Sequence, residues 1–432
     1  MNIWKNALMV FAIATLLQCN TTRKLEPSMN SFRLVAEYEP SEYVWLPFHE
    51  GPSDLGGPPA EDLTYELVRA LSPHVKILFD VVDTVQYRNM TMLLQQQNID
   101  LDRVDFFITR AHAAGALTDI APLFLTRDDG ELATVDFAWG CYGLVSPGDP
   151  RARQDGRFDR DTALEWQLPI LDSSHVVLEG GGIEHNGKGT MLLVEQLAMD
   201  RNPGMTLPEI EKEHIEKLRL KKVIWLKKGP WEEEYKTILP GGIYPVGCGG
   251  HIDEFCRFVN DSTIMLAAVG EDERFRDSIS AENYRRMEEN YQILKNATDQ
   301  DGRPFHIIRV PIPEPHIFEI KYEDAGPYYF DYFPGKKSGD TVRVIAASSY
   351  LNFLIANDVV VVAKYWKEGR SEVKRKKDEE VLRTFEAAFP GKTIVQIDME
   401  GYNNGGGGIH CYSLNVPAAQ NKRSRIIPLV RP

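Results

Sequence analysis

A run of glycines near the C-terminal end of the chain leads directly to a cysteine. Residues 405–411 read Gly-Gly-Gly-Gly-Ile-His-Cys. Four consecutive residues without a Cβ let the backbone adopt positive φ angles and let another group come close to it. Because a cysteine thiolate is a strong nucleophile, this pattern favours a site at which another group approaches Cys411.

A second glycine-prefaced segment carries an imidazole and a carboxylate. His251 and Asp253 stand two residues apart after Gly249 and Gly250. An extended backbone would place both side chains on one face. One cysteine with a distant histidine and carboxylate is the layout of a thiol nucleophile whose partners meet it only after folding. The sequence therefore predicts a cysteine-dependent covalent active site.

Two other patterns could suggest phosphate or metal binding, and neither fits its motif. A near match to a phosphate-binding loop has Gly189 where the hydroxyl should be, and the Asn-Gly pair at 186–187 is typical of a hairpin turn. His251, Asp253 and Cys256 could ligate zinc, but their spacing matches no common structural zinc pattern. We predict a hairpin at 186–187 and no metal site.

Length and charge narrow the class of protein. The 432 residues, 43% hydrophobic and 26% charged, are typical of a globular protein with one large α/β domain or two ordinary ones. A formal net charge of -14 argues against non-specific nucleic-acid binding and favours the approach of small cations. We therefore expect no nucleic-acid partner, although charge alone does not identify the ligand.

The N-terminus is typical of an export signal. Lys5 precedes an apolar run over residues 7–17, too short to span a bilayer as a helix, and the run is followed by Cys19. We expect residues 1–19 to be a signal peptide, 20–32 a linker, and the protein to be secreted or to lie in the periplasm or on the outer surface. Cys19 resembles the lipid-attachment cysteine of bacterial lipoproteins, with ordinary secretion as the alternative.

The other cysteines do not form a disulfide framework. Cys141, Cys248, Cys256 and Cys411 are too few for a chain of this length. The spacing allows a bridge between Cys248 and Cys256, while a nucleophilic Cys411 must stay free.

Strand and helix patterns alternate at short spacing. Strands are expected within residues 38–47, 75–79, 105–108, 222–226, 263–269, 359–362 and 393–397, and helices at 60–70, 92–97, 284–294 and 379–389. This alternation indicates an α/β or α+β protein. Residues 311–340 are rich in proline, glycine and aromatics without a clear period, which predicts a flap over a site or a surface loop packed by its own aromatics.

Seven segments together resemble a known family. In order, they are Glu39-Pro40 with Trp45, Leu178-Glu179-Gly180-Gly181-Gly182, residues 186–190, Arg201-Asn202-Pro203, Gly250-His251-Ile252-Asp253-Glu254-Phe255, Ser349-Tyr350-Leu351-Asn352-Phe353 and residues 406–411. They resemble the agmatine deiminases and the Porphyromonas-type bacterial peptidylarginine deiminases, of the guanidine-modifying superfamily. The resemblance implies a catalytic domain over residues 33–418, a tail over 419–432, and an α/β propeller of five pseudo-symmetric ββαβ units around a central site.

The resemblance also implies roles for the site residues. Cys411 would attack the guanidinium carbon while Asp119 and Asp253 hold its N–H groups. His251 would protonate the departing ammonia and then activate water, with Glu179 orienting the imidazole.

The family's other properties complete this expectation. Gly408 and Asn352 would also bind substrate, and no metal or cofactor is implied. The expected substrate is agmatine, converted to N-carbamoylputrescine in polyamine synthesis, or peptidyl or free arginine or another alkylguanidine. Amidino transfer to an amine and non-catalytic guanidinium binding at the cell surface are the alternatives.

Two segments depart from the family pattern. Ala116, Thr118 and Ala121 flank Asp119 where the family usually has tryptophan, arginine and glycine. Residues 248–250 read Cys-Gly-Gly where Thr-Asp-Gly is usual. Since the first segment helps to shape the pocket for the substrate's tail, the departure bears on which guanidine is bound more than on the reaction.

Overall fold

A four-part unit recurs through the chain: an antiparallel hairpin, a helix, and a third strand that pairs parallel to the second strand of the hairpin. The structure is a computed structural model that describes residues 31–51, 55–111, 116–144, 150–419 and 427–430. The clearest unit consists of β17 (Leu354–Ala356), β18 (Val359–Lys364), α10 (Glu372–Ala388) and β19 (Thr393–Asp398). The four valines at 359–362 are fully buried, as expected of a strand covered on both faces.

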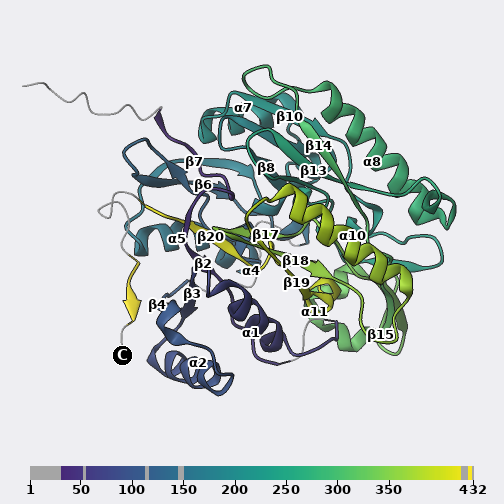
Figure 1. Ribbon diagram of the computed structural model, residues 1–432, viewed down its shortest axis with the longest axis horizontal. Helices are drawn as coiled ribbons and strands as arrows, with labels where there is room; N and C mark the ends of the chain where they lie inside the picture. The colour runs from purple at the N-terminus through teal and green to yellow at the C-terminus, as the bar shows by residue number, and fades with distance from the viewer. Residues whose placement is uncertain (1–30, 52–54, 112–115, 145–149, 420–426, 431–432) are drawn as a thin grey trace, which may run out of the picture.

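Three further units lie between residues 125 and 311. The first consists of β5 (Leu125–Thr126), β6 (Leu132–Ala138), α4 (Pro150–Asp155), α5 (Phe158–Glu165) and β7 (Ile170–Val177). The second consists of β8 (Ile183–His185), β9 (Thr190–Val194), α6 (Glu195–Arg201), α7 (Leu207–Leu218) and β10 (Lys222–Leu226). The third consists of β12 (Cys256–Phe258), β13 (Thr263–Ala268), α8 (Ser278–Asn296) and β14 (His306–Pro311). In each, the crossover helix packs beside its own short sheet. Figure 1 shows α7, α8 and α10 on the outside of the molecule, with the strands behind or beside them.

The fifth unit joins the two ends of the chain. β20 (Leu414–Pro417) pairs antiparallel with β2 (Ser41–Trp45), which is parallel to β3 (Lys76–Val81) after the crossover helix α1 (Ala60–Leu71). The same sheet continues through β4 (Val104–Ile108), which α2 (Thr84–Gln96) precedes, to β21 (Leu429–Val430). β20 lies beside β2 in Figure 1. Because β20 begins three residues after Cys411, this closure fixes the position of the cysteine.

The proline- and aromatic-rich segment has more secondary structure than its sequence indicated. β15 (Ile317–Lys321) pairs antiparallel with β16 (Thr341–Ile345), which pairs parallel with β11 (Ile243–Pro245). Short helices, η8 (Tyr322–Ala325), α9 (Gly326–Tyr329) and η9 (Phe330–Tyr332), join the two strands. The expectation of a structureless stretch over residues 311–340 was therefore wrong, although its aromatics do pack on one another, with Tyr329 and Tyr332 rings 5.5 Å apart.

Most of the other predicted elements are present. The predicted strand at 222–226 has the same bounds as β10. The Asn-Gly pair at 186–187 connects β8 to β9 as a hairpin, with Gly187 at φ 63°. Three helices begin earlier than expected, since α2 starts at Thr84, α8 at Ser278 and α10 at Glu372. The suggested bridge between Cys248 and Cys256 is wrong, because both are free cysteines.

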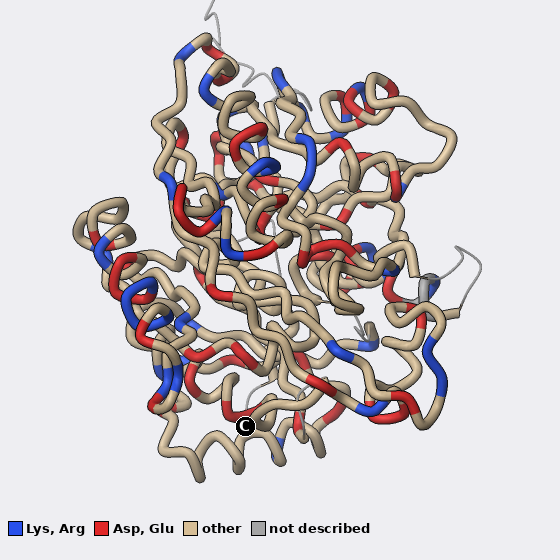
Figure 2. Tube along the Cα trace, turned by 90° about the vertical axis from the view of Figure 1, so that its right-hand side faces the viewer, with Lys and Arg blue, Asp and Glu red and all other residues tan. Residues whose placement is uncertain are grey.

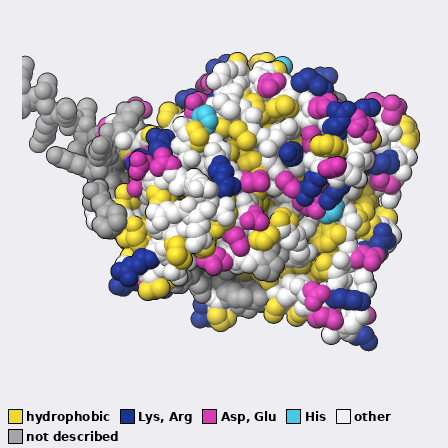
Figure 3. Space-filling view, turned by 60° about the horizontal axis from the view of Figure 1, so that its bottom comes forward, with side chains coloured by type: hydrophobic (Ala, Val, Ile, Leu, Met, Phe, Trp, Pro, Cys, Tyr) yellow, Lys and Arg dark blue, Asp and Glu magenta, His cyan; other side chains and the backbone are white. Residues whose placement is uncertain are grey.

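Charges of both signs are interspersed over the described chain. Acidic and basic positions follow one another along the trace in Figure 2, and on the face shown in Figure 3 they lie beside apolar and uncharged side chains. None of the helices in the described ranges is long and apolar enough to cross a membrane.

Candidate active site

The glycine run places Cys411 in the interior. Helix α11 (Glu400–Asn404) precedes the run, and Gly406 has φ 98°. A Cβ on Gly406 would lie 2.1 Å from the carbonyl oxygen of Val246, so the run can pass this strand end only without side chains. Cys411 is 3% exposed, and its carbonyl oxygen accepts a hydrogen bond of 3.1 Å from the N–H of Thr118.

Three polar groups surround the cysteine sulfur. Sγ of Cys411 lies 3.0 Å from Nδ2 of Asn352, 3.4 Å from Oδ2 of Asp253 and 3.8 Å from Oε1 of Glu254. The same amide nitrogen donates to both carboxyl groups, at 3.0 and 2.8 Å. Asn352 also accepts from the N–H of His410 at 2.9 Å, which fixes its orientation. Asn352 therefore holds the thiol and two acids in one cluster.

His251 belongs to a separate, buried chain of hydrogen bonds. Its Nε2 lies 2.7 Å from Oε2 of Glu179, and Nε of Arg201 donates to Oε1 of the same carboxylate at 2.6 Å. Arg201 also donates to the carbonyl oxygen of Cys248 at 2.5 Å and to the hydroxyl of Tyr235 at 3.0 Å. The side chains of His251 and Glu179 are both 1% exposed, so this pair is shielded from water. The second ring nitrogen, Nδ1, is left free to face the site.

Asp119 lies on α3 (Leu117–Ile120), across from His251. Its Oδ1 accepts from the N–H of Gly181 at 2.7 Å, and its Oδ2 accepts from the hydroxyl of Tyr142 at 2.9 Å. Oδ1 lies 3.8 Å from Nδ1 of His251. Nothing in the sequence indicated a role for Tyr142, because this residue lies in a short turn, where its φ is 54°.

Gly181 marks the point on which these groups converge. A Cβ on Gly181 would lie 2.6 Å from Nδ1 of His251, 3.0 Å from Oδ1 of Asp119 and 3.0 Å from Oδ2 of Asp253. Among the described residues, neither His251 Nδ1 nor Asp253 Oδ1 has a hydrogen-bond partner. A carboxylate oxygen without a donor, near a second carboxylate and at a position that only glycine can occupy, suits a planar cation with several N–H groups.

Burial and charge pairing set the protonation states of these groups. Burial lowers the pKa of His251, but the charge of Asp119 and the hydrogen bond to Glu179 outweigh it and raise that pKa to about 9. Burial alone would raise the pKa of Glu179, which the charge of Arg201 holds at about 2. Burial raises the pKa of Asp119 to about 6. At neutral pH the site thus holds an imidazolium between carboxylates.

The thiol and Glu254 are pushed toward their neutral forms. Burial, followed by the charges of Asp253 and Glu254, raises the pKa of Cys411 well above its usual value. Burial and the charges of Glu233 and Asp253 do the same for Glu254. A bound cation would oppose both shifts, since a nearby positive charge favours the thiolate. No role was predicted for Glu254, whose place next to Asp253 in the sequence was its only signal.

The same cluster bears on metal binding. Ligand atoms of Asp253, Glu254 and Cys411 lie within 4.8 Å of one another. Asn352 Nδ2 already donates toward all three, at the place where a metal ion would have to sit. The donor set therefore fits a hydrogen-bonding organic cation better than a metal ion. Cys256, named with His251 and Asp253 as a zinc alternative, is instead buried in β12 within the hydrophobic core.

The aromatic segment after β15 lies next to the glycine run. The hydroxyl of Tyr329 donates to the carbonyl oxygen of Gly405 at 2.8 Å. Tyr332 is 2% exposed and its ring is 6.4 Å from that of Tyr235, the partner of Arg201. The segment thus packs by its own aromatics and contacts the glycine run before Cys411, while its role as a flap stays a prediction.

Gly408, expected to bind substrate, lies against Asn352. A Cβ on Gly408 would be 2.5 Å from Oδ1 of Asn352, so the glycine allows the amide to reach the cysteine. The structure thus brings together the residues proposed from the sequence: Cys411, His251, Asp253, Asp119, Glu179, Gly408 and Asn352. A buried thiol, an imidazolium and several acids in one cluster suit a cysteine-dependent enzyme that acts on a cation.

Comparison with known proteins identifies the family. Residues 33–417 match the family described as Porphyromonas-type peptidyl-arginine deiminase, so the chain belongs to that family. It is 29% identical over 408 residues to the agmatine deiminase of Pseudomonas putida, covering 91% of this chain and 97% of the relative, and 29% identical over 409 residues to that of Pseudomonas syringae pv. syringae, covering 92% and 99%. The solved structure described as the agmatine deiminase of Enterococcus faecalis catalysing its reaction superposes with a TM-score of 0.69 at 25% identity, covering 90% of this chain and 97% of that one. The resemblance inferred from the motifs is confirmed.

Proposed function

We propose that this protein hydrolyses the guanidinium group of agmatine to a ureido group, releasing ammonia and N-carbamoylputrescine. The observation that carries the proposal is the convergence of His251, Asp119 and Asp253 on the space beside Gly181, with the Cys411 thiol 3.4 Å from Asp253. A guanidinium there would give its N–H groups to the two aspartates and bring its central carbon to the sulfur.

The reaction follows from these positions in two halves. The Cys411 thiolate forms a C–S bond to the guanidinium carbon, and His251 gives its proton to the nitrogen whose bond to that carbon breaks, so ammonia leaves. Water then adds to the amidino carbon and gives one proton to His251, the C–S bond breaks to return the thiolate, and the remaining hydroxyl proton leaves to solvent as the ureido C=O forms. Glu179 keeps the imidazole oriented through both halves and favours its protonated form at the start of each turnover, as its pairing with Arg201 supports.

Agmatine is preferred over peptidyl arginine because the relatives with high coverage are named agmatine deiminases. The family description itself names peptidyl-arginine deiminase, which keeps arginyl peptides as the second substrate class. The site is also closed: Cys411, His251 and Asp253 are each 3% exposed or less, which favours a slender alkylguanidine.

A panel of guanidines tests the assignment. Purified protein should release ammonia from agmatine at a kcat/KM at least about tenfold above that for arginine and a blocked arginyl peptide, because one misfit charged group in a closed pocket costs at least that much. Ammonia would be measured by a coupled assay and N-carbamoylputrescine by mass spectrometry. Preference for the peptide would assign the protein to the second substrate class. Amidino transfer would appear as a product that keeps the amidino group. No turnover of any guanidine would indicate a non-catalytic guanidinium-binding protein.

The pKa directions predict a bell-shaped pH profile. kcat/KM for agmatine should fall below about pH 6, where Asp119 takes up a proton and loses its hold on the cation, and above about pH 9, where His251 loses the proton it gives to ammonia. Glu179→Gln should move the basic limb to lower pH, because it removes the carboxylate that raises the pKa of His251. A kcat/KM that rises without a maximum beyond pH 10 would contradict this assignment and point to thiol ionisation instead.

We also propose that the five repeated units surround the site as a pseudo-symmetric five-bladed propeller. The hairpin, helix and parallel strand in each unit and the closure of β20 onto β2 support this arrangement. The domain bounds at residues 33 and 418 stay a prediction.

Export is proposed for the N-terminal segment. Lys5, the apolar run over residues 7–17 and Cys19 support a signal that leads the protein to the periplasm or outer surface, with lipid at Cys19 or simple secretion as the two outcomes. These residues lie outside the described part of the chain. Detergent partitioning of wild type and Cys19→Ala would separate the two outcomes.

A further inference from the structure

A buried histidine connects the cysteine site to a separate cavity. His410 directly precedes Cys411, and its Nδ1 lies 2.7 Å from Oδ2 of Asp253. Its other ring nitrogen, Nε2, contacts Oε1 of Glu37. We propose that Glu37 and His410 are positioning residues that fix the orientation and charge of Asp253, and through it the state of the Cys411 thiol, from outside the guanidinium site. This inference rests on the proposed deiminase function.

The hydrogen bonds of Asp253 show what such positioning would do. Oδ2 is held by His410 at 2.7 Å and by Asn352 at 3.0 Å, and it also contacts the sulfur of Cys411. Oδ1, by contrast, has no partner among the described residues. Holding Oδ2 from two sides stops the carboxylate from rotating, so that Oδ2 keeps its place beside Gly181 and Oδ1 stays available for an N–H of the cation.

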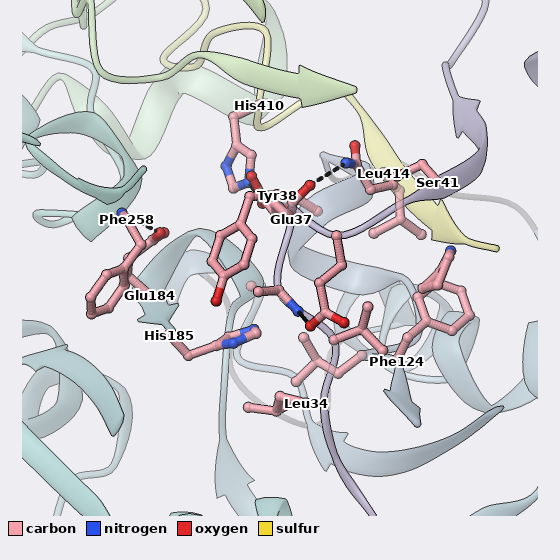
Figure 4. Close-up of a pocket in the computed structure, with 18 of the residues that line it drawn as sticks. Leu34, Glu37, Tyr38, Ser41, Phe124, Glu184, His185, Phe258, His410 and Leu414 are labelled. Carbon is pink, nitrogen blue, oxygen red and sulfur yellow. Dashed lines mark hydrogen bonds and ion pairs between the residues drawn. The ribbon is translucent and has the colours of Figure 1, made fainter. Parts of the chain in front are cut away.

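The other end of this chain of contacts is open to solvent. Glu37 and His410 line a cavity of about 870 Å³, counted with its open mouth, together with Tyr38, Glu184 and His185. Figure 4 shows the Glu37 carboxylate against the His410 ring at one side of this cavity. The exposed fraction of the side chains falls from 30% at Glu37 to 5% at His410 and 0% at Asp253. Neither Cys411 nor His251 lines the cavity, whereas His410 does, so His410 connects the cavity to Asp253.

The charges that face His410 favour an imidazolium. Burial and the nearby Arg257 lower its pKa, while Glu37 and Asp253 outweigh them and raise that pKa to about 9. Both ring nitrogens face carboxylates, and only the protonated ring can donate to both. Arg257 is itself held by Glu37, by Glu184 at 3.0 Å and by the carbonyl oxygen of Phe353 at 2.8 Å. Glu37 and His410 therefore act as an imidazolium clamp on Asp253, and the imidazolium exchanges its proton with solvent through the cavity.

Glu37→Gln tests the clamp, and Glu184→Gln is its matched control. Each variant takes one carboxylate from Arg257 in the same cavity, but only Glu37 touches His410. We expect Glu37→Gln to lower kcat/KM for agmatine about tenfold or more, since hydrogen bonds to charged groups are the strong ones. We also expect the fall of kcat/KM at high pH to begin at lower pH, because His410 loses a charge that raises its pKa and then loses its proton before His251 does. Glu184→Gln should leave the limb in place.

A second measurement does not depend on turnover. Alkylation of Cys411 by iodoacetamide, followed by peptide mass spectrometry between pH 7 and 10, should be slower in Glu37→Gln than in wild type, since the positive charge beside Asp253 is lost at lower pH. An unshifted basic limb with unchanged alkylation, or equal shifts in both variants, would overturn the proposal while leaving the deiminase function intact. Should Glu37→Gln not fold, His410→Gln takes its place, and alkylation as fast as in wild type would overturn the proposal in the same way. If the wild-type protein deiminates no guanidine, the proposed deiminase function is refuted instead. The alkylation rates would still test the imidazolium clamp.

Discussion

Cys411→Ala is expected to lower kcat for agmatine by at least about 10⁴-fold, because removing a covalent nucleophile leaves only the binding contribution to catalysis. Substrate affinity should survive. The amide of Asn352 keeps its two carboxyl acceptors, Asp253 at 3.0 Å and Glu254 at 2.8 Å, after the sulfur is gone. Isothermal titration calorimetry with agmatine should therefore give a dissociation constant within a few-fold of the KM of the wild type.

Cys256→Ala is the matched control for this experiment. Cys256 is a fully buried thiol on β12, five residues beyond His251, with its side chain in the hydrophobic core. Its replacement removes a thiol and some packing without touching the site, so activity should stay within a few-fold of wild type. Residual turnover of Cys411→Ala above about 1% of wild type would refute covalent catalysis by this residue. Loss of agmatine binding would instead assign the sulfur a structural role.

The match between predicted and observed elements depends on how much apolar surface each element buries. The strand at 222–226 and the valines at 359–362 were predicted because their sequence alone marks a covered strand. In α2, by contrast, only Met90 and Leu94 are buried, so most of its length shows no helical period. β15 has no fully buried residue, and its backbone pairing with β16 leaves no trace in the hydrophobic pattern.

The site shows the same division between local and distant information. Short glycine-containing segments carry Cys411, His251 and Asp253. Because glycines allow other groups to come close to the backbone, these three residues could be predicted from the sequence. Tyr142 and Glu37 could not, because their roles arise from contacts with Asp119, 23 residues away, and with His410, 373 residues away.

Asp119 shows how a residue can keep its place when its neighbours in the sequence change. Its flanks depart from the family pattern at Ala116, Thr118 and Ala121. Its carboxylate is nevertheless held from elsewhere in the chain, by the N–H of Gly181 at 2.7 Å and the hydroxyl of Tyr142 at 2.9 Å. Because neither contact comes from the side chains of the altered flanks, these can change while the carboxylate keeps its position.

Gly181→Ala is expected to reduce kcat/KM for agmatine by about 10²-fold or more, because a displacement of about 1 Å in a preorganised site already costs that much. The added methyl would stand 2.6 Å from Nδ1 of His251 and 3.0 Å from an oxygen of each of Asp119 and Asp253. It would thus fill the space in which we place the guanidinium and would push apart the groups that hold it. The fall should appear mainly in KM, since the cation is excluded before the chemical step.

Gly182→Ala separates this effect from a general intolerance of side chains in the glycine triplet. A Cβ on Gly182 would meet the end of the Leu197 side chain at 2.8 Å, which can move aside, and no polar group of the site. Gly182→Ala should therefore keep kcat/KM within about tenfold of wild type, with a thermal unfolding midpoint lowered by a few degrees at most. Equal losses of activity in the two variants, or a Gly181→Ala enzyme with an unchanged KM, would place the guanidinium elsewhere. If Gly181→Ala loses agmatine and Gly182→Ala does not, the cation lies where the imidazole and the two aspartates converge.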